Sequence, residues 1–122
     1  MGKITTTTTK ISKSHLKEQC ECWFGDMVKL VIDVEKEIIG IGGELHADAE
    51  ALLLKQGSKQ QNLWGANFYP AHSPGERIHY TALINIRPHQ DNPSLEILNE
   101  SIKIKIKNLI EKLILNPDEE LV

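Results

Sequence analysis

The chain has 122 residues and a mass of 13.8 kDa, which predicts a single domain over residues 1–122. A composition of 40% hydrophobic and 25% charged residues excludes a disordered or fibrous chain. The net charge of −3 argues against a general nucleic-acid-binding protein, because such proteins usually carry a basic face. No apolar run approaches the ~20 residues of a membrane helix. With two cysteines and no export leader, the sequence is typical of a cytoplasmic protein.

The first predicted elements are an extended N-terminus and a long helix. A run of threonines favours extended backbone, so we expect residues 1–11 to form an edge strand or a frayed tail. From Ser14, a suitable N-cap, apolar residues recur at steps of three and four as far as Ile38, which predicts an amphipathic helix. Gly25-Asp26 would kink it or divide it into two helices. The glycines at 40–43 then end the helix. We do not expect them to form a phosphate-binding loop, because such a loop lies before a helix and not after it.

The period of the pattern changes after these glycines. Residues 44–51 alternate between polar and apolar side chains, which predicts a strand, although Ala, Glu and Leu individually prefer helix. Leu63–Tyr69 is rich in aromatic strand formers and predicts the next strand. Ile78–Arg87 alternates most clearly and predicts a third.

The C-terminal part predicts a helix and a tail. Asn92-Pro93 is suited to open the helix, whose apolar stripe continues to Leu113, and an acidic tail follows at 117–122. In this order, the elements predict an α+β fold, a two-layer sandwich. A three- or four-stranded antiparallel sheet would pack one face on two main helices and leave its other face open. Cys20 falls on the apolar stripe of the first helix and is expected in the core.

Five blocks of the sequence resemble a family of short, uncharacterised bacterial proteins. The resemblance extends over residues 12–113, and the block Gly-Gly-Glu-Leu-His-Ala-Asp is its most distinctive part. The family has no assigned activity, so the resemblance implies a whole single-domain protein and no catalytic residue. The blocks are Phe24–Lys29, Ile41–Asp48, Gly57–Gln60, Leu63–Gly65 and Ile84–Pro88.

The 44–51 segment supplies candidate catalytic and metal-binding residues. On a strand, side chains two positions apart lie on one face at a spacing of ~7 Å. His46 and Asp48 could then act as a base and its orienting acid. Together with Glu50, and with His79 from another strand, they could bind a metal ion. The simpler interpretation is the solvent-exposed side of a half-buried strand. If the segment is helical, His46 and Glu50 become an i, i+4 pair and Asp48 faces elsewhere.

A second group, Asn67, Asn85 and Arg87, supplies candidate ligand-binding residues on the open sheet face. The planar guanidinium of Arg87 suits a carboxylate or phosphate, although an internal partner such as Asp48 or Glu50 would also satisfy it. These three residues could form one polar patch on the open face together with His46 and Asp48.

Two classes of function are compatible with these patterns. The first is a non-enzymatic homo-oligomeric module, such as a homodimer that uses the open sheet face or the threonine edge. The second is a small-molecule or anion binder, or a hydrolase, built on the polar patch. Because we find no cofactor motif, no basic stripe and no membrane segment, we expect no cofactor, no nucleic-acid partner and no membrane partner.

Overall fold

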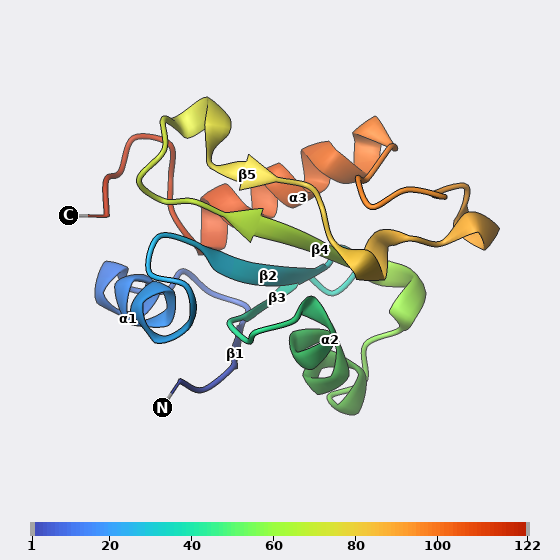
Figure 1. The fold of residues 1–122 in the computed structure, drawn as a ribbon, viewed down its shortest axis with the longest axis horizontal. Helices are drawn as coiled ribbons and strands as arrows, with labels where there is room; N and C mark the ends of the chain where they lie inside the picture. Colours follow the sequence, from blue (N-terminus) through green and yellow to red (C-terminus); the bar gives the residue numbers. More distant parts are fainter. Residues whose placement is uncertain (1, 122) are drawn as a thin grey trace.

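The computed structural model describes residues 2–121, which form three α-helices around a five-stranded antiparallel sheet (Figure 1). The sheet has the order β1-β3-β2-β4-β5. None of the described helices is long and apolar enough to cross a membrane. The strands are β1 (Thr5–Thr7), β2 (Val28–Asp33), β3 (Ile38–Ile41), β4 (Leu63–Phe68) and β5 (Ile78–His79), and the helices are α1 (Lys13–Trp23), α2 (His46–Lys55) and α3 (Glu100–Leu113).

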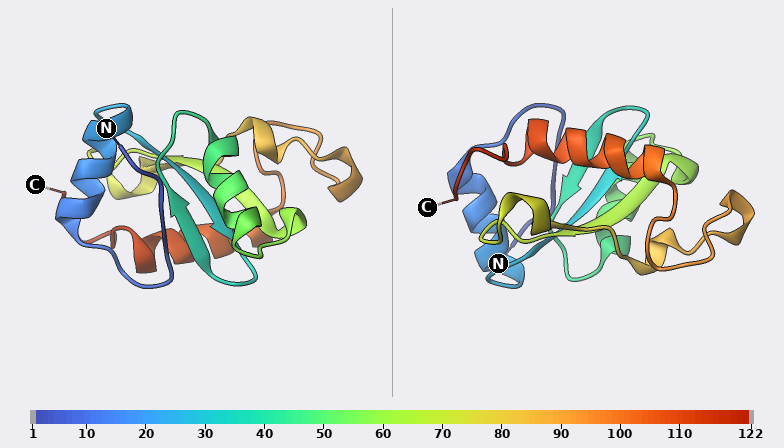
Figure 2. Two further views of the ribbon diagram at one scale, coloured as in Figure 1. Left: turned by 90° about the horizontal axis from the view of Figure 1, so that it is seen from below. Right: turned by 90° about the horizontal axis from the view of Figure 1, so that it is seen from above.

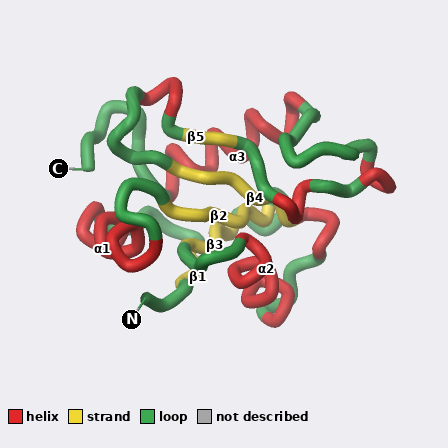
Figure 3. The backbone as a smooth tube through the Cα atoms, in the orientation of Figure 1, coloured by secondary structure: helices red, strands yellow, loops and turns green. Residues whose placement is uncertain are grey.

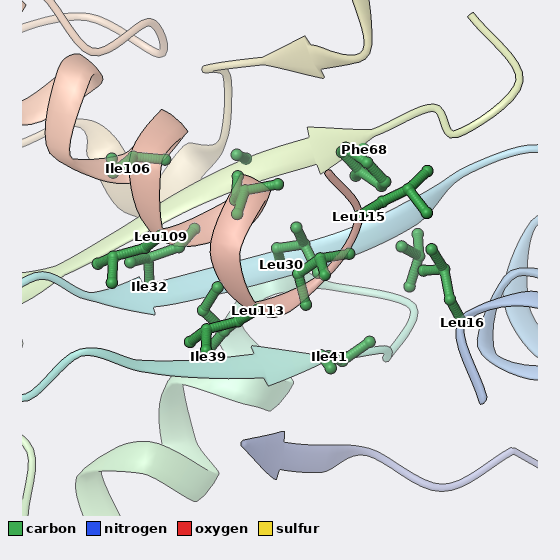
Figure 4. Close-up of a cluster of buried hydrophobic side chains, with 14 of the residues drawn as sticks. Leu16, Leu30, Ile32, Ile39, Ile41, Phe68, Ile106, Leu109, Leu113 and Leu115 are labelled. Carbon is green, nitrogen blue, oxygen red and sulfur yellow. The ribbon is translucent and has the colours of Figure 1, made fainter. Parts of the chain in front are cut away.

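Helices lie on both faces of the sheet, so the α+β class is confirmed but the two-layer arrangement is wrong. Figure 2 shows α2 on one side of the strands and α3 on the other. The larger core lies under α3, where Leu30, Ile32 and Phe68 of the sheet meet Ile106 and Leu113 (Figure 4). Leu16 and Cys20 of α1 also belong to this core, as expected for Cys20.

The opposite face has a smaller core beneath α2. It consists of Val31, Ala49, Leu53 and Leu63, with Ile38 and Ile84 packed against it. The sheet face that we expected to be open is therefore covered over part of its length. Only the end near the start of α2 stays accessible, and this is where polar side chains gather.

The prediction of a helix or helix pair as far as Ile38 was wrong beyond Trp23. Helix α1 begins after Ser12 instead of Ser14, and the Ser12 hydroxyl accepts a hydrogen bond from the amide of His15 at 3.0 Å. Gly25 follows the helix with a φ of 88°, a conformation that favours glycine. Strands β2 and β3 then form a hairpin. Five of the six residues of β2 are buried, and the continuous apolar run Leu30–Ile32 interrupts the alternation that identifies a half-exposed strand.

The prediction of a strand at 44–51 was also wrong, because the chain is helical from His46. Gly42 and Gly43, with φ values of 105° and 100°, turn the chain from β3 into α2. The glycines therefore precede a helix, contrary to our expectation. The intrinsic helix preference of the Ala, Leu and Glu residues prevails over a short alternation of period two.

The predicted strand Ile78–Arg87 is present only as the two residues of β5. Residues 80–99 form a long connection with two 3-10 turns, at Leu83–Asn85 and Pro88–Gln90, which we call the 80–99 loop (Figure 3). Helix α3 starts at Glu100, capped by Asn99, and not at Asn92. Strand β4 and the strand at the threonine run are confirmed.

Side chains take the place of strand pairing in the 80–99 loop. The Oδ1 of Asn85 accepts a hydrogen bond from the Gly65 amide at 2.8 Å, and its Nδ2 donates to the Gly65 carbonyl at 3.0 Å. Asn92 donates to the carbonyls of Asn85 and Glu96. The side-chain amides of Asn85 and Asn92 are therefore buried although they are polar. Polar residues that alternate with apolar ones resemble a half-exposed strand, although the backbone here turns away from the sheet.

The acidic tail, as far as it is described, lies against Lys10 near the N-terminus and against Arg77. Lys10 forms an ion pair with Glu119 at 2.6 Å, and the Arg77 guanidinium donates to the carbonyl oxygens of Asn116 and Glu119. The last residue of the predicted tail, at position 122, lies outside the described residues.

Candidate ligand-binding pocket

A cavity of about 340 Å³ lies where the first turn of α2 meets the sheet and the 80–99 loop. This volume is at the small end of the range of known ligand pockets. The polar groups that line it come from Lys29, His46, Asn67 and Thr81, and the apolar ones from Leu45, Ala47, Ala82, Leu83, Ile84 and Leu95. We call this cavity the ligand pocket.

The register of the sheet places Lys29 and Asn67 side by side. They are directly paired residues of β2 and β4, so their side chains leave the same face of the sheet. Val31, two positions after Lys29, is covered by Ala49 and Leu53 of α2. The Lys29–Asn67 pair lies beyond the part of the sheet that α2 covers, so the side chains of Lys29 and Asn67 line the cavity.

His46, the first residue of α2, is only 6% exposed. Its Nε2 lies 2.9 Å from the carbonyl oxygen of Ala66, which can only accept, so this nitrogen carries the proton. Burial lowers the pKa of His46 to about 4, although the Ala66 hydrogen bond opposes this effect, and the charge of Lys29 lowers the pKa further. The imidazole is therefore neutral at pH 7, with Nδ1 as a hydrogen-bond acceptor.

Asn67 contributes an acceptor that the protein leaves unused. Its Oδ1 is buried and has no hydrogen-bond partner of normal geometry within residues 2–121. The amide is nevertheless near the His46 ring, and this interaction raises the pKa of His46. A buried carbonyl oxygen without a partner is uncommon, because its desolvation costs ~1–3 kcal/mol. This oxygen is screened from solvent, so it is not exposed in the pocket.

Lys29 is the cation of the pocket. Burial lowers the pKa of its ammonium group, and its nearest aromatic neighbour is Phe24, whose ring centroid is 5.4 Å from Nζ. The ion pairs among the described residues involve Lys10, Lys103 and Lys107, and none involves Lys29. No Asp or Glu is among the described residues that line the cavity. The pocket therefore has a positive charge without a carboxylate to balance it.

The N-terminus of α2 adds to this positive potential. Leu45 occupies the N-cap position and offers no side-chain acceptor to the first amides of the helix. The Asp48 carboxylate instead accepts a hydrogen bond from the backbone amide of Leu45, at 3.2 Å. Leu45, His46 and Ala47 all line the cavity. The positive end of the helix dipole thus lies at the same cavity as the ammonium group of Lys29.

The structure brings only part of the predicted polar patch together. His46 and Asn67 line the ligand pocket, whereas Asp48 is exposed on α2 and does not orient the His46 ring. Asn85 is fully buried in its bonds to Gly65 and Leu95. These two assignments fail because they assumed that 44–51 and 78–87 were neighbouring strands.

Arg87 holds the 80–99 loop in place and is not available as an anion clamp. Its guanidinium donates to the carbonyl oxygens of Ile84, Gln60 and Leu63, and its carbon lies 4.1 Å from the centre of the Trp64 ring. The charge of Arg87 lowers the pKa of Glu50, although burial of that carboxyl raises it by more. Neither Glu50 nor Asp48 forms an ion pair with Arg87 within residues 2–121.

The predicted metal ligands do not converge. His46 and Glu50 are one turn apart on α2, as in the helical alternative, and Asp48 faces elsewhere. His79 stacks obliquely on Tyr69, with 4.6 Å between ring centroids. Within residues 2–121, no three His, Cys, Asp or Glu side chains are close enough to hold a metal ion.

A larger cavity of about 540 Å³ lies between α1, residues 70–77 and the tail. Its charged groups are of both signs, and Arg77 is already bonded to three backbone carbonyls. Burial raises the pKa of the Cys20 thiol at its wall to about 11, so the thiol stays protonated. The charged residues that line this cavity are Lys17, Glu21, Arg77, Asp118 and Glu120.

The sequence analysis missed Lys29 and the N-terminus of α2. Lys29 was hidden in a segment predicted as helix, where it would be an ordinary solvated cation. The signal for the start of α2 is Gly42-Gly43, because both residues adopt a positive φ that favours glycine and turn the chain towards the helix. If this pair is interpreted as the end of a preceding helix, the start of α2 goes unrecognised.

The fold and the pocket define a small α+β protein with a ligand-sized cavity at which a cation, a neutral imidazole and the N-terminus of a helix meet. Residues 5–113 match the family described as "Protein of unknown function (DUF5674)", and the chain belongs to this family. The comparisons with curated proteins and with solved structures found no match.

Proposed function

We propose that this protein binds a small anionic ligand in the ligand pocket, with Lys29 as the charge partner. The observation that carries the proposal is the meeting of Lys29 and the N-terminus of α2 in one cavity whose described lining has no carboxylate. An anion there would satisfy a partly buried ammonium group and the first amides of the helix together.

The groups around Lys29 support an anion more than a cation or a neutral molecule. The neutral His46 adds no negative charge, and the nearest carboxylate of α2, Asp48, is engaged with the Leu45 amide. Inside a small cavity the effective dielectric constant is below that of water, so the attraction between Lys29 and an anion is stronger than at an exposed site. Arg87, the anion clamp expected from the sequence, has no part in this proposal.

Calorimetric titration with acetate and with inorganic phosphate tests the proposal directly. We expect measurable binding of at least one of these anions, and at least a tenfold loss of affinity in Lys29→Met. Lys105→Met, which removes the same charge from an exposed position on α3, serves as the control and should bind like the wild type. No heat of binding with either anion, or an equal loss in both variants, would contradict the proposal.

Self-association is the second candidate function, and the large apolar side chains exposed near the pocket favour it. Leu83 is 74% exposed and Leu45 59%, and Ile86 and Leu98 of the 80–99 loop are also exposed. Exposed apolar side chains that lie together, as Leu45, Leu83 and Leu95 do at the pocket, are used for protein contacts. Sedimentation equilibrium over a wide range of concentrations tests this candidate. A dimer weakened by Leu83→Ser would support it, and a monomer at all concentrations would exclude it.

A further inference from the structure

We infer that the ligand of this pocket is an aliphatic monocarboxylate, with its carboxylate at Lys29 and the start of α2 and its unsubstituted hydrocarbon chain against the leucines of the rim. This inference rests on the proposed function and names the class of its ligand. It follows from the single charge of the lining, from the exposed leucines around the cavity and from the small number of accessible polar atoms in it.

The lining carries one charge, which matches one carboxylate. Lys29 is the only charged side chain among the described residues of the lining, because His46 is neutral at pH 7. The charge of Lys29 lowers the pKa of His46, so its ammonium group acts close to the first residue of α2. A carboxylate carries one negative charge, whereas a phosphate monoester carries nearly two at this pH, and the second would have no ionic partner in the pocket.

Three leucines at the rim of the cavity offer an apolar surface to the rest of the ligand. Leu45, Leu83 and Leu95 line the cavity, and their side chains are between 44% and 74% exposed. One belongs to the N-cap position of α2 and the other two to the 80–99 loop, so the fold brings them together from separate parts of the chain. A hydrocarbon chain between them would remove these side chains from water, which is favourable in proportion to the apolar area that is buried.

Few polar atoms of the lining are open to the body of a ligand. Asn67 Oδ1 is screened from solvent, and the Nε2 of His46 is bonded to the Ala66 carbonyl. Hydroxyl groups along the chain would lose their hydrogen bonds to water on entry and find few partners in return, which weakens binding. The body that suits this lining is therefore hydrocarbon. At about 30 Å³ for each small group, 340 Å³ accommodates roughly eleven non-hydrogen atoms, which limits the ligand to about nine carbons.

The test compares four ligands on the whole chain by calorimetric titration: acetate, hexanoate, 3,4-dihydroxybutanoate and monopentyl phosphate. We expect hexanoate to bind at least tenfold more tightly than acetate, because each fully buried methylene contributes a factor of about four. It should also exceed 3,4-dihydroxybutanoate, which has the same number of non-hydrogen atoms, by about tenfold, and monopentyl phosphate, which has the same alkyl chain, by about fivefold. Leu83→Ser should weaken hexanoate by about threefold or more without changing acetate, and Ile104→Ser, an exposed position on α3, should change neither.

The outcomes separate this inference from the proposed function. If acetate or inorganic phosphate binds in a Lys29-dependent manner but hexanoate binds no more tightly than acetate, the inference is wrong and the anion site stands. Equal binding of 3,4-dihydroxybutanoate and hexanoate, or tighter binding of monopentyl phosphate than of hexanoate, would also overturn the inference. If none of the anions binds, or if Lys29→Met binds hexanoate as the wild type does, the proposed function fails as well.

Discussion

The two faces of the sheet differ in the size of their apolar cores and in the polar groups beside them. The face under α3 is closed by alternating residues of three strands, and the cluster they form with α1 and α3 is almost entirely apolar. The face under α2 has only four fully buried apolar residues, and beyond them lie Lys29, His46 and Asn67. The comparison indicates that the first face supplies the stability of the fold, and that the second retains polar groups which stability alone does not require.

The largest effect is expected on the closed face. Ile32 is fully buried beneath α3, so Ile32→Ala leaves a cavity and should lower the free energy of unfolding by ~2–5 kcal/mol, measured by urea denaturation. Leu54→Ala on α2, at a side chain that is 42% exposed, is the matched control and should cost far less. Equal losses would mean that the two faces contribute alike.

A pH effect of comparable size is expected on the other face. The pKa of His46 is about 4 in the folded state and near 6.5 when unfolded, so the unfolded chain binds the proton more tightly. This contribution to stability is fully present above pH 6.5 and is lost as the pH falls towards 4. We expect a loss of about 3 kcal/mol over this window. His46→Gln should flatten the dependence, and an unchanged slope in this variant would assign it to other groups.

Removal of the Asn85 amide in the 80–99 loop should lower the free energy of unfolding more than removal of the Asn67 amide in the pocket. Asn85→Ala removes both partners of Gly65 and should destabilise the protein by ~2–3 kcal/mol in chemical denaturation. Asn67→Ala removes an acceptor that has no partner, so its cost should stay below ~1 kcal/mol. If Asn67→Ala were the more damaging of the two, Asn67 would be part of the scaffold and not of a site.

The smallest effect on stability is expected for the cation itself. Lys29 has no ion pair, and burial already disfavours its charge. Lys29→Met should therefore leave the midpoint of thermal unfolding unchanged or raise it slightly, by the equivalent of ~0.5 kcal/mol. A clear loss of stability would indicate that Lys29 supports the fold.

Most of the elements that could be predicted from the sequence have one solvent-exposed face and one buried face, because their apolar residues then recur with the period of the element. Helix α1 and most of α3 have such faces, and the threonine run is an edge strand. Five of the six residues of β4 are buried, and this strand was identified by its aromatic strand formers. The hairpin of β2 and β3 could not be recognised, because the apolar run Leu30–Ile32 interrupts the alternation of β2, and the apolar residues of this segment fit a helical spacing equally well. The 80–99 loop was hidden for the opposite reason, since Asn85 and Arg87 alternate with apolar residues while bonding backbone groups.

The candidate site was predicted only in part for a related reason. His46 and Asn67 were chosen for their chemistry, and they do lie together, but by way of a helix N-terminus and not through neighbouring strands. Lys29 could be assigned to the pocket only once the pairing of β2 with β4 was known, because this register is a long-range property of the fold. Asp48, Asn85 and Arg87 have equally suitable side chains, yet each is engaged by backbone groups.

The central claim is that an anion binds between Lys29 and the first turn of α2, and amide NMR with ¹⁵N labelling tests it most directly. On addition of acetate or inorganic phosphate, we predict saturable shifts of the His46 and Ala47 amides with at least one of these anions, with smaller shifts near Thr81, and no such shifts in Lys29→Met. Unchanged His46 and Ala47 amides at saturating ligand, or the same shifts in Lys29→Met as in the wild type, would contradict the account.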